Sequence, residues 1–236
     1  MGHHAIVVAR GFAKSTSPKA YLNHAKFEYL SSTPRLSGMH DEIVQKPADT
    51  TADLHPLVRD RWSPRIFDTE HSIGTSELES IGEAFRWAPS SSNQQPWKLV
   101  LLTRGSELFE SIASTGLTGF NQTWAPDASA LAVVLAAKTF EGKDRKMAET
   151  YFDVGLAASQ LVTQVESMGL KAHFMGGIVP EKIREDLKVA EHEVVCVIAL
   201  GKQGSILGKD EAIVSRETAP RTRNNSSDVY VIDSTL

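Results

Sequence analysis

Three arginines and a serine stand close together in the segment RDRWSPRIF. Arg59, Arg61 and Arg65 surround Ser63, shortly before a predicted helix. A planar guanidinium beside a hydroxyl group is suited to an anionic oxygen group, because each charge-assisted hydrogen bond contributes about 1.5–3 kcal/mol. The segment therefore indicates an anion site. A solvated basic face would have the same composition.

A second cluster is polar but uncharged. The six residues from Ser90 to Gln95 (SSSNQQ) all offer donors or acceptors, and Pro96 and Trp97 follow directly. Such a mixture is suited to a neutral heterocycle that both donates and accepts hydrogen bonds. An ordinary polar loop is the alternative interpretation.

A third cluster lies near the C-terminus, in the segment APRTRNN. Arg221 and Arg223 are two residues apart, so in an extended segment their side chains point to the same side. Such a pair is suited to an anion, and a basic surface tail is the alternative.

Several other sites are excluded or unsupported. The segment GKQGSILGK has Gln203 in place of the first glycine of a phosphate loop, and Asp210 stands where Ser or Thr must bind magnesium. No G-x-G-x-x-G occurs, so no Rossmann dinucleotide site is predicted. Beyond His3 and His4 the eight histidines show no metal-ligand spacing, so no metal is expected. A single cysteine, Cys196, excludes an intramolecular disulfide and is expected as a small apolar residue in a buried strand.

Alternating helical and strand patterns position these clusters. Apolar residues at helical spacing predict a helix over 75–88, with a capping box from Ser76 to Glu79, and a long helix over 147–168 that ends at Gly169. Shorter helices are predicted at 106–113 and 180–189. Strands are predicted at 98–102, 131–137, 171–175 and 193–200, and a short apolar segment follows at 229–232.

The composition fits one globular domain with a substantial core, since 41% of the 236 residues are hydrophobic and 23% are charged. A net charge of −4 leaves no overall basic field for nucleic acid or anionic lipid. No apolar run is long enough to span a membrane. We therefore expect a cytoplasmic protein with neither nucleic-acid nor membrane partners.

Residues 1–38 differ from the rest, because they carry five basic residues against one acidic residue. We expect a flexible N-terminal extension, or a misassigned start with the natural start at Met39. A Ser/Thr-rich, acid-poor transit peptide has a similar composition. The folded domain is expected to comprise residues 39–236.

Taken in order, five segments resemble the motifs of the FMN-dependent nitroreductase family. RWSPRIF is similar to the family's opening Arg-x-Ser-x-Arg/Lys motif, and PSSSNQQPW to its Pro-Ser-Ser-x-Asn-x-Gln-Pro-Trp motif. FNQTWAPDAS, FMGGIVPEKI and PRTR resemble three further family segments. The resemblance covers about residues 56–232.

The resemblance implies a role for each matching residue. The FMN phosphate would be bound by Arg61, Ser63, Arg221 and Arg223. Arg65 would lie at the N1/O2 edge of the flavin ring, where a fixed cation stabilises the negative charge of the reduced form. The ribityl chain and ring would be lined from the partner subunit by Pro89, Ser90, Ser91 and Asn93. Further contacts to the ring region would come from Asn121, Met175, Gly176 and Gly177.

The sequence departs from the family pattern in two places. Trp62, counted among the cofactor-binding residues, stands where relatives commonly carry a second basic residue, so the phosphate loses a contact that Arg221 and Arg223 would have to replace. The polar segment 138–149 is short where larger relatives have a helical insertion over the active site. An open pocket is therefore expected.

The implied activity is that of an NAD(P)H-dependent FMN oxidoreductase. Nicotinamide would transfer hydride to N5 of a tightly bound FMN and leave, and an electron-poor acceptor such as a nitroaromatic or a quinone would then be reduced at the same ring face. No protein residue need act as acid or base, because the flavin carries the chemistry. Two alternatives remain: a flavin-binding or flavin-consuming protein of the same fold without general reductase activity, and a structural protein that has lost the flavin.

The implied fold is α+β, with three α/β/α layers in which helices cover both faces of a mixed sheet. The resemblance also implies an intertwined homodimer, in which the strand at 229–232 is exchanged into the partner's sheet. A strand that returns to its own sheet is the alternative.

Overall fold

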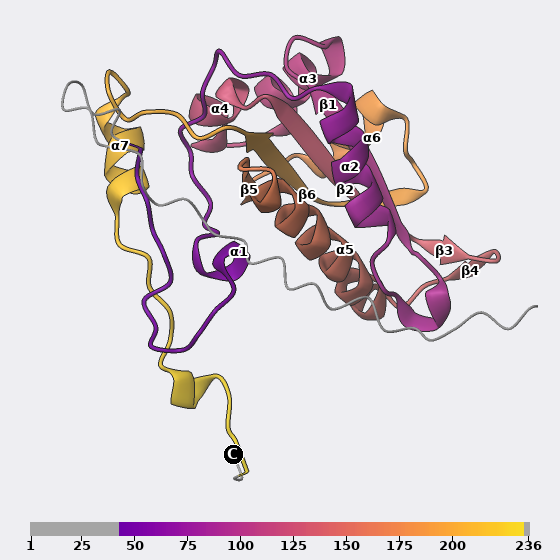
Figure 1. Ribbon diagram of the computed structural model, residues 1–236. Helices are drawn as coiled ribbons and strands as arrows, with labels where there is room; N and C mark the ends of the chain where they lie inside the picture. Colours follow the sequence, from indigo (N-terminus) through magenta and orange to yellow (C-terminus); the bar gives the residue numbers. More distant parts are fainter. Residues whose placement is uncertain (1–42, 234–236) are drawn as a thin grey trace, which may run out of the picture. The chain divides into compact units, whose positions relative to one another are not determined.

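A four-stranded sheet lies at the centre of residues 43–233, the part of the chain that the computed structural model describes (Figure 1). The strand order is β1–β2–β6–β5, and each neighbouring pair is antiparallel. The prediction was of a mixed sheet, which needs at least one parallel pair. These four strands form antiparallel pairs alone. The strand bounds are β1 Trp97–Thr103, β2 Ala130–Ala137, β5 Lys171–Met175 and β6 His192–Gly201.

Strand β2 is buried on both faces and divides the core in two. Leu131, Val133 and Leu135 pack into one apolar cluster, and the alternating Ala132 and Val134 pack into the other, as the period-two geometry of a strand requires. The first cluster is covered by short helices: α3 Glu107–Ser111, the π-helical turn Ile112–Gly116 that continues it, α4 Asn121–Trp124 and α6 Pro180–Leu187. The second is covered by α2 Thr75–Arg86 and α5 Met147–Ser167. The three-layer α+β prediction is therefore confirmed.

The long helix α5 supplies most of the second layer. Val154, Leu161 and Val165 are fully buried along one stripe, while small alanines on the facing side of β2 allow the helix to approach the sheet closely. The helix ends where predicted, because Gly169 adopts a left-handed conformation (φ +74°) and ends the helix in the manner of a glycine C-cap.

The start of α2 differs from the predicted capping box. The helix begins at Thr75 with Gly74 as its N-cap, and the carboxylate of Glu77 accepts from the backbone N–H of Gly74 at 2.8 Å. The start at Thr75 agrees with the predicted helix, but the capping box of Ser76 and Glu79 was wrong, because the N-cap lies two residues earlier, at Gly74, which places Glu77 at the third helical position.

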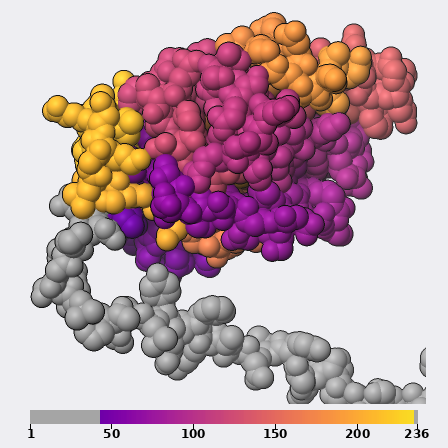
Figure 2. Space-filling view, turned by 90° about the horizontal axis from the view of Figure 1, so that it is seen from above, coloured from indigo at the N-terminus to yellow at the C-terminus, as the bar shows by residue number. Residues whose placement is uncertain are grey.

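Five α-helices and strands were not predicted. A short hairpin of β3 Thr139–Phe140 and β4 Lys143–Asp144 occupies part of the segment 138–149. The other three are the helices α1 Pro56–Arg59, α4 Asn121–Trp124 and α7 Glu211–Thr218. In Figures 1 and 2, α7 and the hairpin lie at opposite edges of this region.

The ends of the chain bear on two sequence predictions. The predictions for residues 1–38 lie outside the described residues. Residues 229–232 form no strand within the single chain, and Val229 and Ile232 are 68% and 77% exposed. Their exchange into a partner's sheet stays a prediction. None of the helices among residues 43–233 combines the length and the apolar character needed to cross a bilayer.

Candidate functional site

A pocket of about 250 Å³ gathers basic residues from three distant parts of the sequence. Six of its ten lining residues are Lys or Arg, and no acidic side chain lines it. The lining residues predicted from the sequence are Arg61, Trp62, Ser63, Arg65, Arg221 and Arg223. Those not predicted are Lys46, Arg216, Ala219 and Pro220. The structure therefore brings together the first and third sequence clusters, which lie about 160 residues apart.

Helix α7 fixes the segment that carries Ser63 and Arg65. Glu217 on this helix is fully buried, and its Oε2 accepts from the backbone N–H of Arg65 at 2.7 Å. The backbone of Ile66 also bonds this carboxylate. Burial raises the pKa of Glu217, although the two amides and the charges of Lys46 and Arg65 oppose that rise. This carboxylate ties α7 to the first arginine cluster.

Arg221 is held at the pocket by backbone carbonyls. Its Nη1 donates to the carbonyl oxygens of Lys46 and Arg59, each at 3.0 Å. Burial lowers the pKa of Arg221, and the neighbouring charges of Arg61 and Arg223 lower it further. The pocket thus concentrates like charges, which an anion would stabilise.

Two members of the first cluster differ in position. Arg65 is half-buried, and burial lowers the pKa of its guanidinium, with Glu217 opposing and Arg216 adding to the effect. Arg59, by contrast, does not line the pocket, and its guanidinium pairs with Asp60 at 2.7 Å. Sequence proximity to Ser63 therefore overstated the role of Arg59.

Beneath the pocket lies a buried histidine that the sequence did not single out. His173 on β5 is 8% exposed, and its Nδ1 lies 2.8 Å from the carbonyl oxygen of Pro64, so Nδ1 carries the hydrogen in that bond. Its ring packs on Trp124 with a centroid distance of 4.5 Å. Burial lowers the pKa of His173 to about 4, and the charge of Arg65 adds to the effect. A neutral His173 therefore supports the Ser63–Arg65 segment from below.

Asn121 and Gly177 form a second group. The side-chain Nδ2 of Asn121 donates to the carbonyl oxygen of Gly177 at 3.2 Å. A Cβ on Gly177 would come within 2.9 Å of that nitrogen, whereas one on Gly176 would meet no atom within 4 Å. Met175 is 1% exposed and packs in the core, so neither its side chain nor its backbone is accessible in the single chain. Arg216 connects this group to the basic pocket, because its guanidinium lies 4.1 Å from the ring centroid of Phe120.

The uncharged cluster lies elsewhere. Pro89, Ser90 and Ser91 border a pocket of about 520 Å³ with residues of α5, including the exposed Phe152. Ser92, Asn93 and Gln95 all have positive φ values near +50°. Such left-handed conformations in non-glycine residues are uncommon and persist only where the surroundings fix them.

Two side chains fix this loop. Asp153 on α5 is 4% exposed, and its two carboxylate oxygens lie 3.3 and 3.2 Å from the backbone nitrogen of Ser91. Arg145 donates from Nη2 to Oε1 of Gln94 at 2.7 Å. Neither residue was predicted, since each acts through the backbone or an amide and belongs to no motif.

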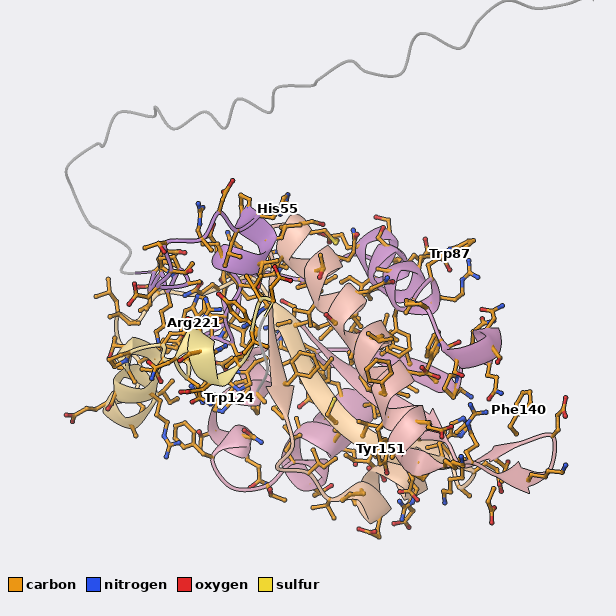
Figure 3. All side chains as sticks on the ribbon, turned by 90° about the horizontal axis from the view of Figure 1, so that it is seen from below. His55, Trp87, Trp124, Phe140, Tyr151 and Arg221 are labelled. Carbon is orange, nitrogen blue, oxygen red and sulfur yellow. The ribbon has the colours of Figure 1, made fainter. Side chains whose placement is uncertain are left out.

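We call residues 90–95 the polar loop, and the pocket lined by Arg61 and Arg221 the basic pocket. Within one chain the two are separate. Their pockets share no lining residue. In Figure 3, Arg221 lies at one end of the described region and Phe140, whose hairpin adjoins the loop, at the other. The predicted cofactor residues Pro89, Ser90, Ser91 and Asn93 therefore do not meet Arg61 in a single subunit.

Comparison with known protein families matches residues 58–202 to the Nitroreductase family. The chain belongs to the nitroreductase family. An oxygen-insensitive NADPH nitroreductase of Helicobacter pylori (strain J99 / ATCC 700824) is 30% identical over 183 residues, covering 62% of this chain and 86% of the relative.

Solved structures of similar fold include a crystal structure described as an oxidoreductase containing FMN. It is 32% identical, has a TM-score of 0.72 and covers 79% of this chain and 95% of its own. A protein of Exiguobacterium sibiricum 255-15, solved in complex with FMN, is 21% identical with a TM-score of 0.62, and the match covers 80% of this chain and all of that one.

The match confirms the resemblance read from the five ordered motifs. The matched range of this chain includes Arg61, Asn121 and Gly177 but ends before Arg221 and begins after Lys46. The individual ligand roles of these residues stay predictions. Among residues 43–233 no group of three or more His, Cys, Asp or Glu side chains is placed to hold a metal ion.

Proposed function

We propose that this nitroreductase is an FMN-dependent oxidoreductase, which uses NAD(P)H to reduce electron-poor acceptors such as nitroaromatics and quinones by a ping-pong reaction. The observation that carries the proposal is the basic pocket, in which Arg61, Ser63, Arg221 and Arg223 converge around about 250 Å³ without a lining carboxylate. The named NADPH nitroreductase relative and the FMN-containing structures support the choice of cofactor.

The pocket fits the phosphate of FMN on electrostatic grounds. Arg61 and Arg223 both lower the pKa of Arg221, so the guanidinium groups repel one another until an anion lies between them. The indole Nε1 of Trp62 is buried and has no acceptor among the described residues. Unpaired buried donors are rare in folded proteins, and a ligand oxygen would satisfy this one.

The group around Asn121 and Gly177 fits a flat ring. Gly176 is exposed and has open space where a side chain would be, so its backbone is accessible to a planar ligand. Asn121 has one amide hydrogen bonded to Gly177, and an amide side chain has further donor and acceptor capacity. These residues would bind and orient the isoalloxazine.

When bound, FMN would supply the hydride chemistry by accepting two electrons from the nicotinamide and passing them to the acceptor. The chain's own residues would bind the cofactor and polarise its ring. Arg65 keeps its charge because an arginine pKa remains far above neutrality even when lowered, and its half-buried guanidinium is a fixed cation in a region of low dielectric. Such a cation stabilises an anionic ring system and raises its reduction potential.

We further propose a homodimer as the working form. The polar loop and the basic pocket lie apart in one chain, so a single cofactor that touches both must lie between two copies. The exposed apolar run Val229 to Ile232 and the exposed Phe152 supply apolar surface of the kind that subunit contacts bury.

The proposal is tested by anaerobic titration of the FMN-loaded protein with NADH or NADPH. We expect the visible flavin band to bleach and to recover on addition of menadione or a nitroarene over repeated cycles. A protein that binds FMN but never bleaches would instead support a flavin-binding or flavin-consuming role. A colourless protein that ignores added FMN would overturn the proposal altogether.

Light scattering tests the dimer independently of turnover. We expect twice the mass of the 25.8 kDa chain at micromolar concentration. A monomer with FMN bound would exclude the shared site.

A further inference from the structure

The segment Val44 to Ala48 runs along the basic pocket and is fixed at three points. The carbonyl oxygen of Val44 accepts from Nε2 of Gln203 at 2.7 Å, that of Lys46 accepts from Arg221 at 3.0 Å, and the N–H of Ala48 donates to the carbonyl oxygen of Arg59 at 2.7 Å. Exposure alternates along it, with residues 43, 45 and 47 exposed and residues 44, 46 and 48 partly buried. This alternation is that of an extended segment with one inward face, and Lys46 lies on that face.

Lys46 turns its ammonium toward the pocket. Nζ lies 4.5 Å from the ring centroid of Trp62, a cation–π geometry that favours tryptophan over other rings. The same pocket is lined by Arg61, Ser63 and Arg223. The segments that carry Lys46 and Arg223, more than 150 residues apart, thus both supply cations to this pocket.

The charges around Lys46 do not cancel it by contact. Burial lowers its pKa, Glu217 raises it and Arg65 lowers it again. Within residues 43–233 none of the ion pairs shorter than 4 Å includes Lys46. A partly buried ammonium without a contact carboxylate, beside a cluster of arginines, favours an external anion.

Trp62 gives a second, independent pointer to a ligand. It is 5% exposed, lines the pocket, and its Nε1 lacks an acceptor within the described chain. Indole is a donor only, so an acceptor such as a ligand oxygen would satisfy it.

We propose that Lys46 is a phosphate-binding residue of this site, held in place by the ring of Trp62, and that this pair supplies the positive charge that the first arginine motif lacks at position 62. The inference rests on the proposed function, since it takes the anion to be the phosphate of FMN. It adds to the site a residue that lies upstream of the matched family range, 58–202.

The test compares Lys46→Gln, which removes the charge and leaves a polar but shorter side chain, with Lys46→Arg, which keeps the charge. Lys202→Gln is the matched control, because it removes one positive charge from an exposed lysine that does not line the pocket. Dissociation constants for FMN and for riboflavin, which lacks the phosphate, are measured by flavin fluorescence at several salt concentrations.

We expect Lys46→Gln to weaken FMN binding by about tenfold or more, since it removes one charge-assisted hydrogen bond to the phosphate. Riboflavin affinity should stay within about twofold, because the lost bond is to the phosphate. The dependence of FMN affinity on salt should weaken in Lys46→Gln alone, since one charge contact is lost. Lys46→Arg and Lys202→Gln should resemble the wild type.

If Lys46 only balances Glu217, the ratio of FMN to riboflavin affinity will be the same in Lys46→Gln as in the wild type, and the inference is overturned. Arg61→Ala separates this failure from that of the proposed function. If Arg61→Ala lowers the ratio of FMN to riboflavin affinity and Lys46→Gln leaves it unchanged, the phosphate site stands and only the role of Lys46 is overturned. Wild-type protein that does not prefer FMN to riboflavin overturns both.

Discussion

The basic pocket and the polar loop differ in how they are assembled. The pocket is charged and partly buried, and it is built by contacts that join residues more than 150 positions apart, such as Arg221 with the carbonyl of Lys46. The loop is uncharged and largely exposed, and its strained residues Ser92 and Asn93 follow one another in sequence. It is held from below by the buried Asp153.

This difference separates two kinds of recognition. The pocket is formed within one subunit, and its repulsive charges give it affinity for an anion whatever that anion carries. The loop presents neutral donors and acceptors away from that pocket, and in the proposed dimer they would meet the ligand held by the charged pocket of the other copy. Changes in the pocket should therefore discriminate FMN from riboflavin, and changes in the loop should not.

The largest expected effect comes from removing two pocket arginines. Arg61→Ala with Arg223→Ala should weaken FMN binding by about 100-fold or more, because two charge-assisted contacts of about 1.5–3 kcal/mol each are lost. Riboflavin binding should change by less than about threefold. Isothermal calorimetry of both ligands measures the contrast.

Two further measurements qualify this result. Arg86→Ala, which removes an arginine paired with Glu83 on the exposed face of α2, should leave both affinities unchanged. The ligand-free double variant should be no less stable to urea than the wild type, because both arginines lower the pKa of Arg221 by repulsion. An FMN affinity untouched by the double substitution would disprove the phosphate site.

Acid should lower the free energy of unfolding through the protonation of His173. Its pKa is about 4 in the folded chain against an ordinary value of 6.5, so the unfolded chain takes up the proton first. The stabilising contribution is complete above pH 6.5 and is lost as the pH falls toward 4, amounting to about 3 kcal/mol over that interval.

His173→Asn isolates this contribution, because an asparagine amide can still donate toward the Pro64 carbonyl but takes up no proton. Between pH 7 and pH 4.5 the free energy of unfolding of the wild type should fall by about 2–3 kcal/mol more than that of the variant. Urea titrations at both pH values measure the difference. Parallel profiles would show that burial of His173 does not resist protonation.

A loop variant gives the opposite signature. Asp153→Ala frees the N–H of Ser91 and relaxes the strained loop, so FMN and riboflavin should both bind about tenfold more weakly, which corresponds to about 1.4 kcal/mol. The ratio of the two affinities should not change. Thr163→Ala, an exposed position on the same helix that bonds only its own helix backbone, serves as the control. A selective loss of FMN affinity in Asp153→Ala would erase the distinction between the two regions.

The elements that carry both regions were largely predictable. The continuous apolar run at 131–137 predicted β2 as a strand buried on both faces, and the helical stripe of α5 with its stop at Gly169 follows from local preferences. The cap of α2 was misjudged because Ser76 and Glu79 have the spacing of a capping box, whereas the observed N-cap is Gly74, which has no side chain to signal it.

The site was predictable only where it forms a motif. Arg61, Ser63 and Arg223 stand in recognisable segments, whereas Lys46 and Glu217 stand in none. Their positions depend on contacts between distant segments, such as that of Glu217 with the N–H of Arg65, 152 residues away. Charge alone did not select them either, because a lone lysine or glutamate is most often a solvated surface residue.

The smallest expected effects separate two adjacent glycines, Gly176 and Gly177, beside Asn121. In Gly177→Ala the new Cβ would lie 2.9 Å from Nδ2 of Asn121 and 3.0 Å from Oγ1 of Thr118. Both are side-chain ends that can move, but Asn121 then loses its bond to the Gly177 carbonyl, at a cost of about 1 kcal/mol in unfolding free energy.

Gly176→Ala meets no atom within 4 Å and should leave the stability of the ligand-free chain unchanged. Its added methyl group should instead weaken FMN and riboflavin equally, because a ligand that approaches this backbone does so with its ring. Urea unfolding and flavin titration of the two variants would show that stability at position 177 and access at position 176 are separate requirements, and equal behaviour of the two would refute this.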